Sequence, residues 1–190
     1  MKRVGNLWEE LTGWENMVRS LKLAAAGKRF RPDVAAFLCD TETQLARLRL
    51  ELIAGEYLPG PYHVFRIHEP KPRQISAAPF RDRVVHHALT GVLEPVFERR
   101  FHPASFACRK GLGTHAALRH VRSAAARYRY ALKLDIRKYF PSIDHEVLVA
   151  QLERVVKCRP SMELAKTIIH SSNPQETVNW YFPGDPVHAP

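Results

Sequence analysis

The stretch YALKLDIRKYFPSIDH, residues 130–145, decides how this sequence is interpreted. It opens with an apolar run of strand character, carried by Tyr130, Leu132 and Leu134. The predicted strand delivers a carboxylate, Asp135, at its end, and an aromatic, Phe140, follows before a helix predicted to start at residues 142–144. Strand-end carboxylates hold Mg²⁺ at many phosphoryl-transfer sites, because a hard cation binds oxygen ligands fixed on a rigid element. A lone Asp after a strand otherwise caps the next turn.

Two further segments precede this stretch and support one interpretation. In KPRQISAAPFRDRVVHHAL, residues 71–89, basic residues lead into Asp-Arg-Val-Val and a predicted helix. In SFACRKGLGTHAAL, residues 105–118, an arginine precedes a glycine-rich turn and another predicted helix. With residues 130–145 they resemble three consecutive motifs of bacterial reverse transcriptases of the retron and diversity-generating retroelement kind, and the resemblance covers residues 60–185. Two segments favour the latter kind: the sequence Ala-Cys-Arg-Lys-Gly at residues 107–111 and WYFPGD at residues 180–185.

The resemblance implies an α+β fold with three regions along the chain. These are a helical N-terminal segment over residues 1–58, a fingers region over residues 59–128 and a partial palm over residues 129–190. The resemblance also implies RNA-directed DNA polymerase activity, in which deoxynucleotides are added to a primer. The implied partners are an RNA template, a DNA primer and a dNTP, with a retroelement accessory protein as a further candidate.

The resemblance also assigns roles to individual residues. Two Mg²⁺ ions would assist nucleotidyl transfer: Asp135 would bridge both, and the backbone carbonyl of Ile136 would complete the shell of the ion on the nucleotide side. Phe140 would lie under the incoming sugar and exclude a 2′-hydroxyl by its bulk. Lys71 and Arg73 would hold the triphosphate, since arginine offers a planar fork and lysine a point charge. The alternatives are a core aromatic at Phe140 and an ordinary solvated turn around Lys71.

The chain is strongly basic, with 29 Lys plus Arg against 19 Asp plus Glu and a formal net charge of +10. A field of that sign favours polyanions, nucleic acid first. In the fingers region, Arg109 and Lys110 make a glycine-flanked basic turn, which we expect to bind nucleic acid. A helix with Thr114 as its predicted N-cap follows the turn. Arg81 and Arg83 either contact template phosphates or are merely solvated, and the sequence leaves both alternatives open.

The sequence favours neither a membrane protein nor a secreted one. No uninterrupted apolar run approaches the roughly 18 residues of a membrane span, and the start MKRVGNLWEE turns acidic and polar too early for a secretory signal peptide. The three cysteines are an odd number without metal-type spacing. We therefore expect a reduced cytoplasmic protein that does not bind membranes.

The remaining patterns predict the elements around the motifs. Two apolar stripes at helical spacing predict N-terminal helices: Leu7, Leu11, Trp14, Val18, Leu21 and Ala25, then Val34, Phe37, Leu38, Leu45, Leu48 and Leu52. Residues 61–78 predict two short strands around a turn at residues 69–72. Residues 79–98 predict a helix with an apolar face, and Asp82 lies in its first turn, where an acidic side chain is favourable.

No Tyr-x-Asp-Asp string, which supplies further carboxylates in complete members of this family, occurs in the 190 residues. Asp144 is expected to cap the helix that follows it, and Asp185 to lie in a Pro-Gly-Asp turn. We therefore expect an N-terminal fragment from a truncated or frameshifted gene, with an incomplete palm and no polymerase activity alone. The alternative hypothesis is a non-catalytic RNA- or DNA-binding module on the same partial fold.

Overall fold

The computed structural model describes residues 2–68, 72–136 and 139–172. Its contacts divide the chain into two compact units. Unit 1 contains the described residues up to Val92 and those from Phe140 onward, and unit 2 contains Leu93–Tyr139. The helix α5, Phe80–Glu98, belongs to both units, because the division falls inside it.

The N-terminal part of unit 1 is helical, but its first helix is broken. Two helices form here: α1, Trp8–Thr12, and α2, Trp14–Ala25. Gly13 separates them with an extended backbone (φ −60°, ψ 140°), so the single helix predicted over residues 7–25 is wrong at this point. The break also changes which face is buried, because Met17 lies in the core whereas Trp14 is 44% exposed.

The second predicted stripe also forms two helices. They are α3, Pro32–Cys39, and α4, Thr41–Ala54. Asp40 separates them with a non-helical backbone (φ −135°, ψ 55°), and α4 ends at Gly55, whose φ of 73° is a left-handed conformation that glycine adopts without strain. Leu45, Leu48 and Leu52 are buried, so this part of the stripe is confirmed as core.

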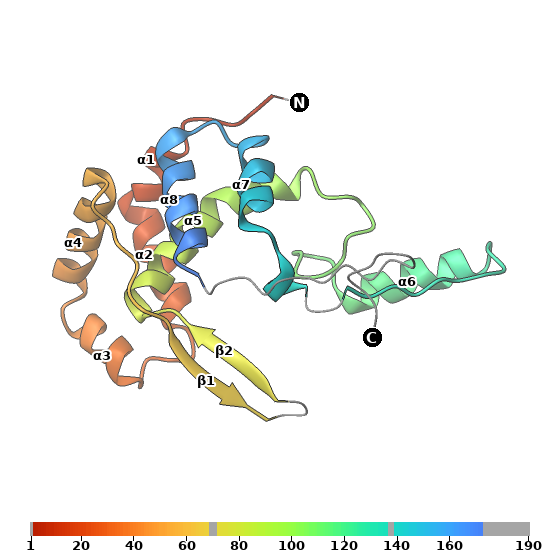
Figure 1. Cartoon of the computed structure of the whole chain (residues 1–190), viewed down its shortest axis with the longest axis horizontal. Coiled ribbons are helices and arrows are strands. Elements are labelled where there is room, and N and C mark those ends of the chain that lie inside the picture. The colour runs from red at the N-terminus through yellow and green to blue at the C-terminus, as the bar shows by residue number, and fades with distance from the viewer. Residues whose placement is uncertain (1, 69–71, 137–138, 173–190) are drawn as a thin grey trace, which may run out of the picture. The chain divides into compact units, whose positions relative to one another are not determined.

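The hairpin predicted over residues 61–78 is confirmed. Its strands are β1, His63–Ile67, and β2, Arg73–Ala77. They pair antiparallel, so that Ile67 lies opposite Arg73, and all five β1 residues are exposed. Figure 1 shows the two strands as a ribbon that extends away from the helices of unit 1. The helix predicted after the hairpin is α5, and its buried face includes Val84, Val85 and Ala88.

Unit 1 also includes the last described segment of the chain. This segment contains the 3-10 helix η1, Phe140–Ser142, and the helices α7, His145–Glu153, and α8, Arg159–His170. α8 packs against both α1 and α7. Val156, between α7 and α8, is buried and forms a parallel bridge with Val4. These contacts place the first and last described segments side by side.

The described residues of unit 2 form one helix besides the end of α5. This helix is α6, Thr114–Ala125, and Gly113 occupies its N-cap position with a φ of 114°. The prediction that Thr114 caps the helix is therefore wrong, because Thr114 is already the first helical residue. A positive φ at the cap favours glycine, which has no Cβ to clash with the backbone.

The strand predicted at the start of residues 130–145 does not form. Residues 130–136 have neither helical nor strand backbone, and Tyr130, Leu132 and Leu134 are 81–84% exposed. A strand is defined by pairing of its N–H and C=O groups with a neighbour, and β1 and β2 are the only paired strands in the described residues. The α+β class is therefore represented by helices and one two-stranded sheet. None of the described helices is long and apolar enough to span a membrane.

Candidate functional site

Asp135 and Ile136, the residues predicted to bind metal, lie in the irregular segment of unit 2. Both side chains are exposed, that of Ile136 by 65%. Within the described ranges, no three His, Cys, Asp or Glu side chains lie close enough together to hold a metal ion. The described carboxylates therefore do not fit the two-Mg²⁺ site that the resemblance implies, because such a site needs several oxygen ligands on rigid elements.

Phe140 opens η1 in unit 1, and its side chain is 81% exposed. A core aromatic would be shielded from water by its neighbours, so the alternative in which Phe140 packs in the core is not supported. The predicted contact between Phe140 and a nucleotide sugar stays a prediction.

The β1–β2 hairpin presents an exposed cation at its outer end. Arg73 is the first residue of β2, opposite Ile67, and its side chain is exposed. Lys71, its predicted partner in triphosphate binding, lies outside the described residues. A guanidinium on a paired strand binds phosphate from a fixed backbone position, which favours bidentate contact. Binding of a triphosphate by Arg73 stays a prediction.

A buried polar network at the base of the hairpin is centred on Asp82, which is 1% exposed. Its Oδ1 accepts a hydrogen bond from the hydroxyl of Tyr57 at 2.8 Å, and its Oδ2 accepts one from the backbone N–H of Gly60 at 2.8 Å. Burial raises the pKa of Tyr57, and the neighbouring charge of Asp82 raises it further. The two bonds tie the segment that leads into β1 to the helix that follows β2.

Sequence reasoning gave Asp82 only the role of a favourable charge at a helix N-terminus. The apolar residues at helical spacing from Asp82 are a better indication of its role. At helical spacing from Asp82, the chain carries Val85, Leu89 and Val92, which are all buried. An acidic residue on such an apolar stripe is forced inside and must find hydrogen-bond donors there.

Arg81 and Arg83 are engaged with other residues of unit 1. Arg81 forms an ion pair with Glu51 and donates a hydrogen bond to the carbonyl of Leu58 at 3.3 Å. Arg83 lies 3.6 Å from the carboxylate of Asp33. The sequence left two alternatives open for these arginines, phosphate contact or plain solvation. It predicted neither ion pair. A phosphate would have to compete with the two carboxylates, so contact with template phosphates stays a prediction.

Arg109 and Lys110 differ in their surroundings within unit 2. Nε of Arg109 lies 2.9 Å from the carboxylate of Glu98, and its Nη1 donates to the carbonyls of His102 at 3.1 Å and Ser105 at 3.0 Å. Lys110 is exposed. Arg109 therefore holds the turn together, whereas Lys110 presents its charge to solvent. Binding of nucleic acid by either residue stays a prediction.

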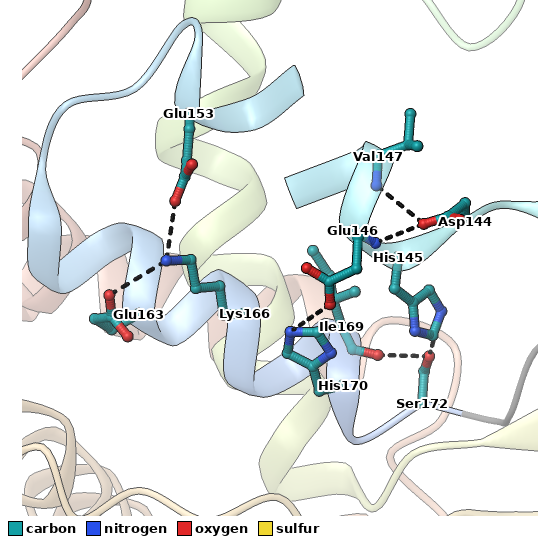
Figure 2. Close-up of polar contacts among 10 residues, drawn as sticks. All are labelled: Asp144, His145, Glu146, Val147, Glu153, Glu163, Lys166, Ile169, His170 and Ser172. Carbon is teal, nitrogen blue, oxygen red and sulfur yellow. Dashed lines mark hydrogen bonds and ion pairs between the residues drawn. The ribbon is translucent and has the colours of Figure 1, made fainter. Parts of the chain in front are cut away.

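The helix after η1 is held against α8, as Figure 2 shows. Nε2 of His145 lies 3.3 Å from the hydroxyl of Ser172, and the rings of His145 and His170 meet edge to face with centroids 6.2 Å apart. Nζ of Lys166 lies 2.9 Å from the carboxylate of Glu153, which adds a second link between the two helices. These contacts fix the direction in which the chain leaves η1.

Asp144 caps α7, as predicted, and its Oδ1 accepts from the backbone N–H groups of Glu146 at 2.8 Å and Val147 at 3.0 Å (Figure 2). Asp144→Ala is expected to lower the free energy of unfolding by about 1 kcal/mol, because both amides lose their acceptor. Urea denaturation measures the difference. Asp144→Ser retains a capping oxygen and is the control, expected to stay within about 0.5 kcal/mol of the parent chain. An equal loss in both variants would contradict the capping role.

The sequence matches known proteins over more than half of its length. Residues 67–182 match the family model described as reverse transcriptase (RNA-dependent DNA polymerase). The chain is 36% identical over 94 residues to nuclear intron maturase 1, mitochondrial, of Arabidopsis thaliana, and 31% identical over 135 residues to protein YkfC of Escherichia coli strain K12. It is 23% identical over 145 residues to the group II intron-encoded protein LtrA of Lactococcus lactis subsp. cremoris. The matches cover 50%, 66% and 75% of this chain, but 13%, 35% and 24% of the relatives' own lengths.

Proposed function

This chain belongs to the reverse transcriptase family, and we propose that it takes part in RNA-directed DNA synthesis, in which a primer on an RNA template is extended with deoxynucleotides. The observation that carries the proposal is the family match over residues 67–182. That range contains the hairpin strand β2, the helix α5, the turn with Lys110 and the segment with Asp135. All three motifs that carry the sequence resemblance overlap it.

The hairpin is the part of unit 1 that we assign to the incoming nucleotide. Arg73 is exposed at its outer end, and the bonds of Asp82 to Tyr57 and Gly60 tie down its base. A cation that binds a triphosphate loses less conformational freedom when its backbone is already held in place. The Asp82 network therefore supports the assignment of Arg73 to phosphate binding by keeping the start of β1 close to α5.

A non-catalytic nucleic-acid-binding module is the second candidate function. One observation favours it: in the described part of the chain, no group of three or more His, Cys, Asp or Glu side chains that could hold a metal ion includes Asp135. Enzymes of this family use Mg²⁺, and the described residues alone do not supply a site for it. Both candidates require nucleic-acid binding, and only the polymerase requires primer extension, so the two assays together distinguish them.

The subtype and cellular setting stay predictions. The names of two relatives refer to introns, whereas the sequence motifs favour the retron or diversity-generating kind. We propose a cytoplasmic location and an accessory protein encoded by the same retroelement as a further partner. The division into a helical segment, a fingers region and a palm region at residues 58 and 128 is likewise a proposal.

Affinity of the chain for single-stranded RNA is expected to fall steeply with salt, because a net charge of +10 favours phosphate contacts. Arg73→Ala and Lys110→Ala should each flatten the log–log salt dependence by about 0.7, the value for one phosphate bound on a single strand. Fluorescence anisotropy at several salt concentrations measures the slopes.

The exposed Arg154 provides the charge-matched control for this experiment, and Arg154→Ala should leave the slope unchanged. Arg109→Ala is less informative, because it also removes the bonds to Glu98, His102 and Ser105. An affinity that does not respond to salt would count against nucleic acid as the partner.

A further inference from the structure

The turn between α2 and α3 exposes an aromatic side chain at a defined position. Phe30 is fully exposed. The turn around it is formed by backbone bonds, in which Lys28 donates to the carbonyl of Ala25 at 3.0 Å and Arg31 donates to that of Lys28 at 3.0 Å. Gly27 enters the turn with a φ of 68°, a left-handed value suited to glycine. Phe30 therefore stands on an ordered turn and not on an extended loop.

The side chains on either side of Phe30 are cationic. Lys28, Arg29 and Arg31 form no ion pair with any residue that the structure describes, and Arg29 and Arg31 are exposed. The nearby acid, Asp33, faces Arg83 of α5 at 3.6 Å. We call Lys28, Arg29, Phe30 and Arg31 the basic turn.

The fold places the basic turn near the start of α5. The pKa of His87 is lowered by burial first, and then by the positive charges of Lys28 and Arg83. Lys28 and Arg83 thus act on the same imidazole, although they lie far apart in the sequence and both belong to unit 1. Lys28 of the basic turn therefore lies within electrostatic reach of the start of α5, where the side chain of Arg83 is 19% exposed and paired with Asp33.

We propose that the basic turn is a binding site for single-stranded RNA, in which Phe30 stacks on an unpaired base and Arg29 and Arg31 contact the phosphates on either side. Every base has a face on which an aromatic ring stacks, and an unpaired strand offers that face where a duplex does not. Arginine neutralises phosphate and stacks on bases as well. This site goes beyond the proposed function, on which it rests for nucleic acid as the ligand, and it is separate from the hairpin with Arg73.

The test measures binding of fluorescein-labelled single-stranded oligouridylate to the full 190-residue chain. Phe30→Ala is expected to weaken binding by about 5- to 150-fold, the range expected when one base is no longer stacked. Phe30→Trp should restore it. The double variant Arg29→Ala, Arg31→Ala should weaken binding and flatten the salt dependence by about 0.7 for each phosphate that is no longer neutralised.

Matched controls separate these effects from a general reduction of apolar surface or charge. Leu50 is an exposed apolar side chain on α4, 62% exposed, and Leu50→Ala should leave binding unchanged. The double variant Arg47→Ala, Arg154→Ala removes the same charge from exposed positions on α4 and just after α7. In this background, Phe30→Ala should weaken binding by the same factor as in the parent chain. Circular dichroism of every variant checks that the helices remain folded.

The outcomes distinguish this site from the proposed function. If no variant binds RNA and neither does the parent chain, nucleic-acid binding itself fails. If Arg73→Ala and Lys110→Ala weaken binding but the variants of the basic turn do not, only the site proposed here is wrong. Binding of Phe30→Ala to phosphatidylglycerol vesicles is measured as well. If this variant loses vesicle binding but keeps RNA binding, the turn binds a lipid surface and the proposal is overturned. Equal effects of Phe30→Ala on single-stranded and duplex RNA would also overturn it.

Discussion

Asp82→Ala is expected to lower the free energy of unfolding by about 2–5 kcal/mol, because it removes two hydrogen-bond acceptors from a buried site. The hydroxyl of Tyr57 and the backbone N–H of Gly60 each lose a 2.8 Å bond to this carboxylate. A buried donor left without an acceptor has given up its hydrogen bond to water and gains none in exchange. Urea denaturation followed by circular dichroism measures the change.

Asp33→Ala is the matched control for Asp82→Ala. Both residues are acids in the first turn of a helix, and both have an arginine nearby, but the side chain of Asp33 is 54% exposed and that of Asp82 only 2%. The control should cost less than about 1 kcal/mol, since exposed ion pairs contribute little. Asp82→Asn keeps an acceptor oxygen and should fall between the two. Similar losses for Asp33→Ala and Asp82→Ala would show that burial of Asp82 is not what makes it important.

The 190-residue chain is expected to give no Mg²⁺-dependent primer extension above a control without protein. Nucleotidyl transfer of the two-metal type needs carboxylates that hold two cations about 3.5–4 Å apart, and the mutual repulsion of the ions must be offset by those ligands. Asp135 is exposed on an irregular segment, and the described residues contain no group of three or more His, Cys, Asp or Glu side chains that could hold a metal ion. Incorporation of labelled dNTP on a primed RNA template measures activity.

RNA binding by the same preparation is the positive control for this experiment, because it shows that inactive protein is still folded and able to bind its ligand. Asp135→Asn should then change neither binding nor the background incorporation. Robust Mg²⁺-dependent extension by the parent chain, abolished by Asp135→Asn, would show that the expectation is wrong and that the chain assembles a complete site in the presence of substrate.

Local patterns predicted the elements whose stability comes from nearby residues. The strands at residues 61–78, the helix over residues 79–98 and the cap at Asp144 follow from short-range pairing, apolar periodicity and side-chain hydrogen bonding. The breaks at Gly13 and Asp40 were missed, because a stripe of apolar residues continues across a short interruption without revealing it.

The parts that could not be predicted depend on partners distant in the sequence. The run at Tyr130 has strand character, but a strand also needs a neighbour with which to pair, and no described strand pairs with it. The internal ion pairs of Arg81 and Arg109 were missed for the same reason. Composition counts an arginine as a free charge, and only the fold shows that Glu51 or Glu98 lies beside it.

The bonds of Arg109 to Glu98, His102 and Ser105 have a consequence for how this part of the sequence can diverge. One planar guanidinium satisfies a carboxylate and three carbonyls at once, which a single ammonium group on a flexible stem does not reproduce. A lysine at this position would keep the net charge but would not make the set of hydrogen bonds that holds the turn together. Over evolutionary time, positions 98 and 109 are therefore expected to covary, together with Phe101, whose ring centroid lies 5.6 Å from the guanidinium carbon. The side chains of His102 and Ser105 are less constrained, because Arg109 contacts only their carbonyls.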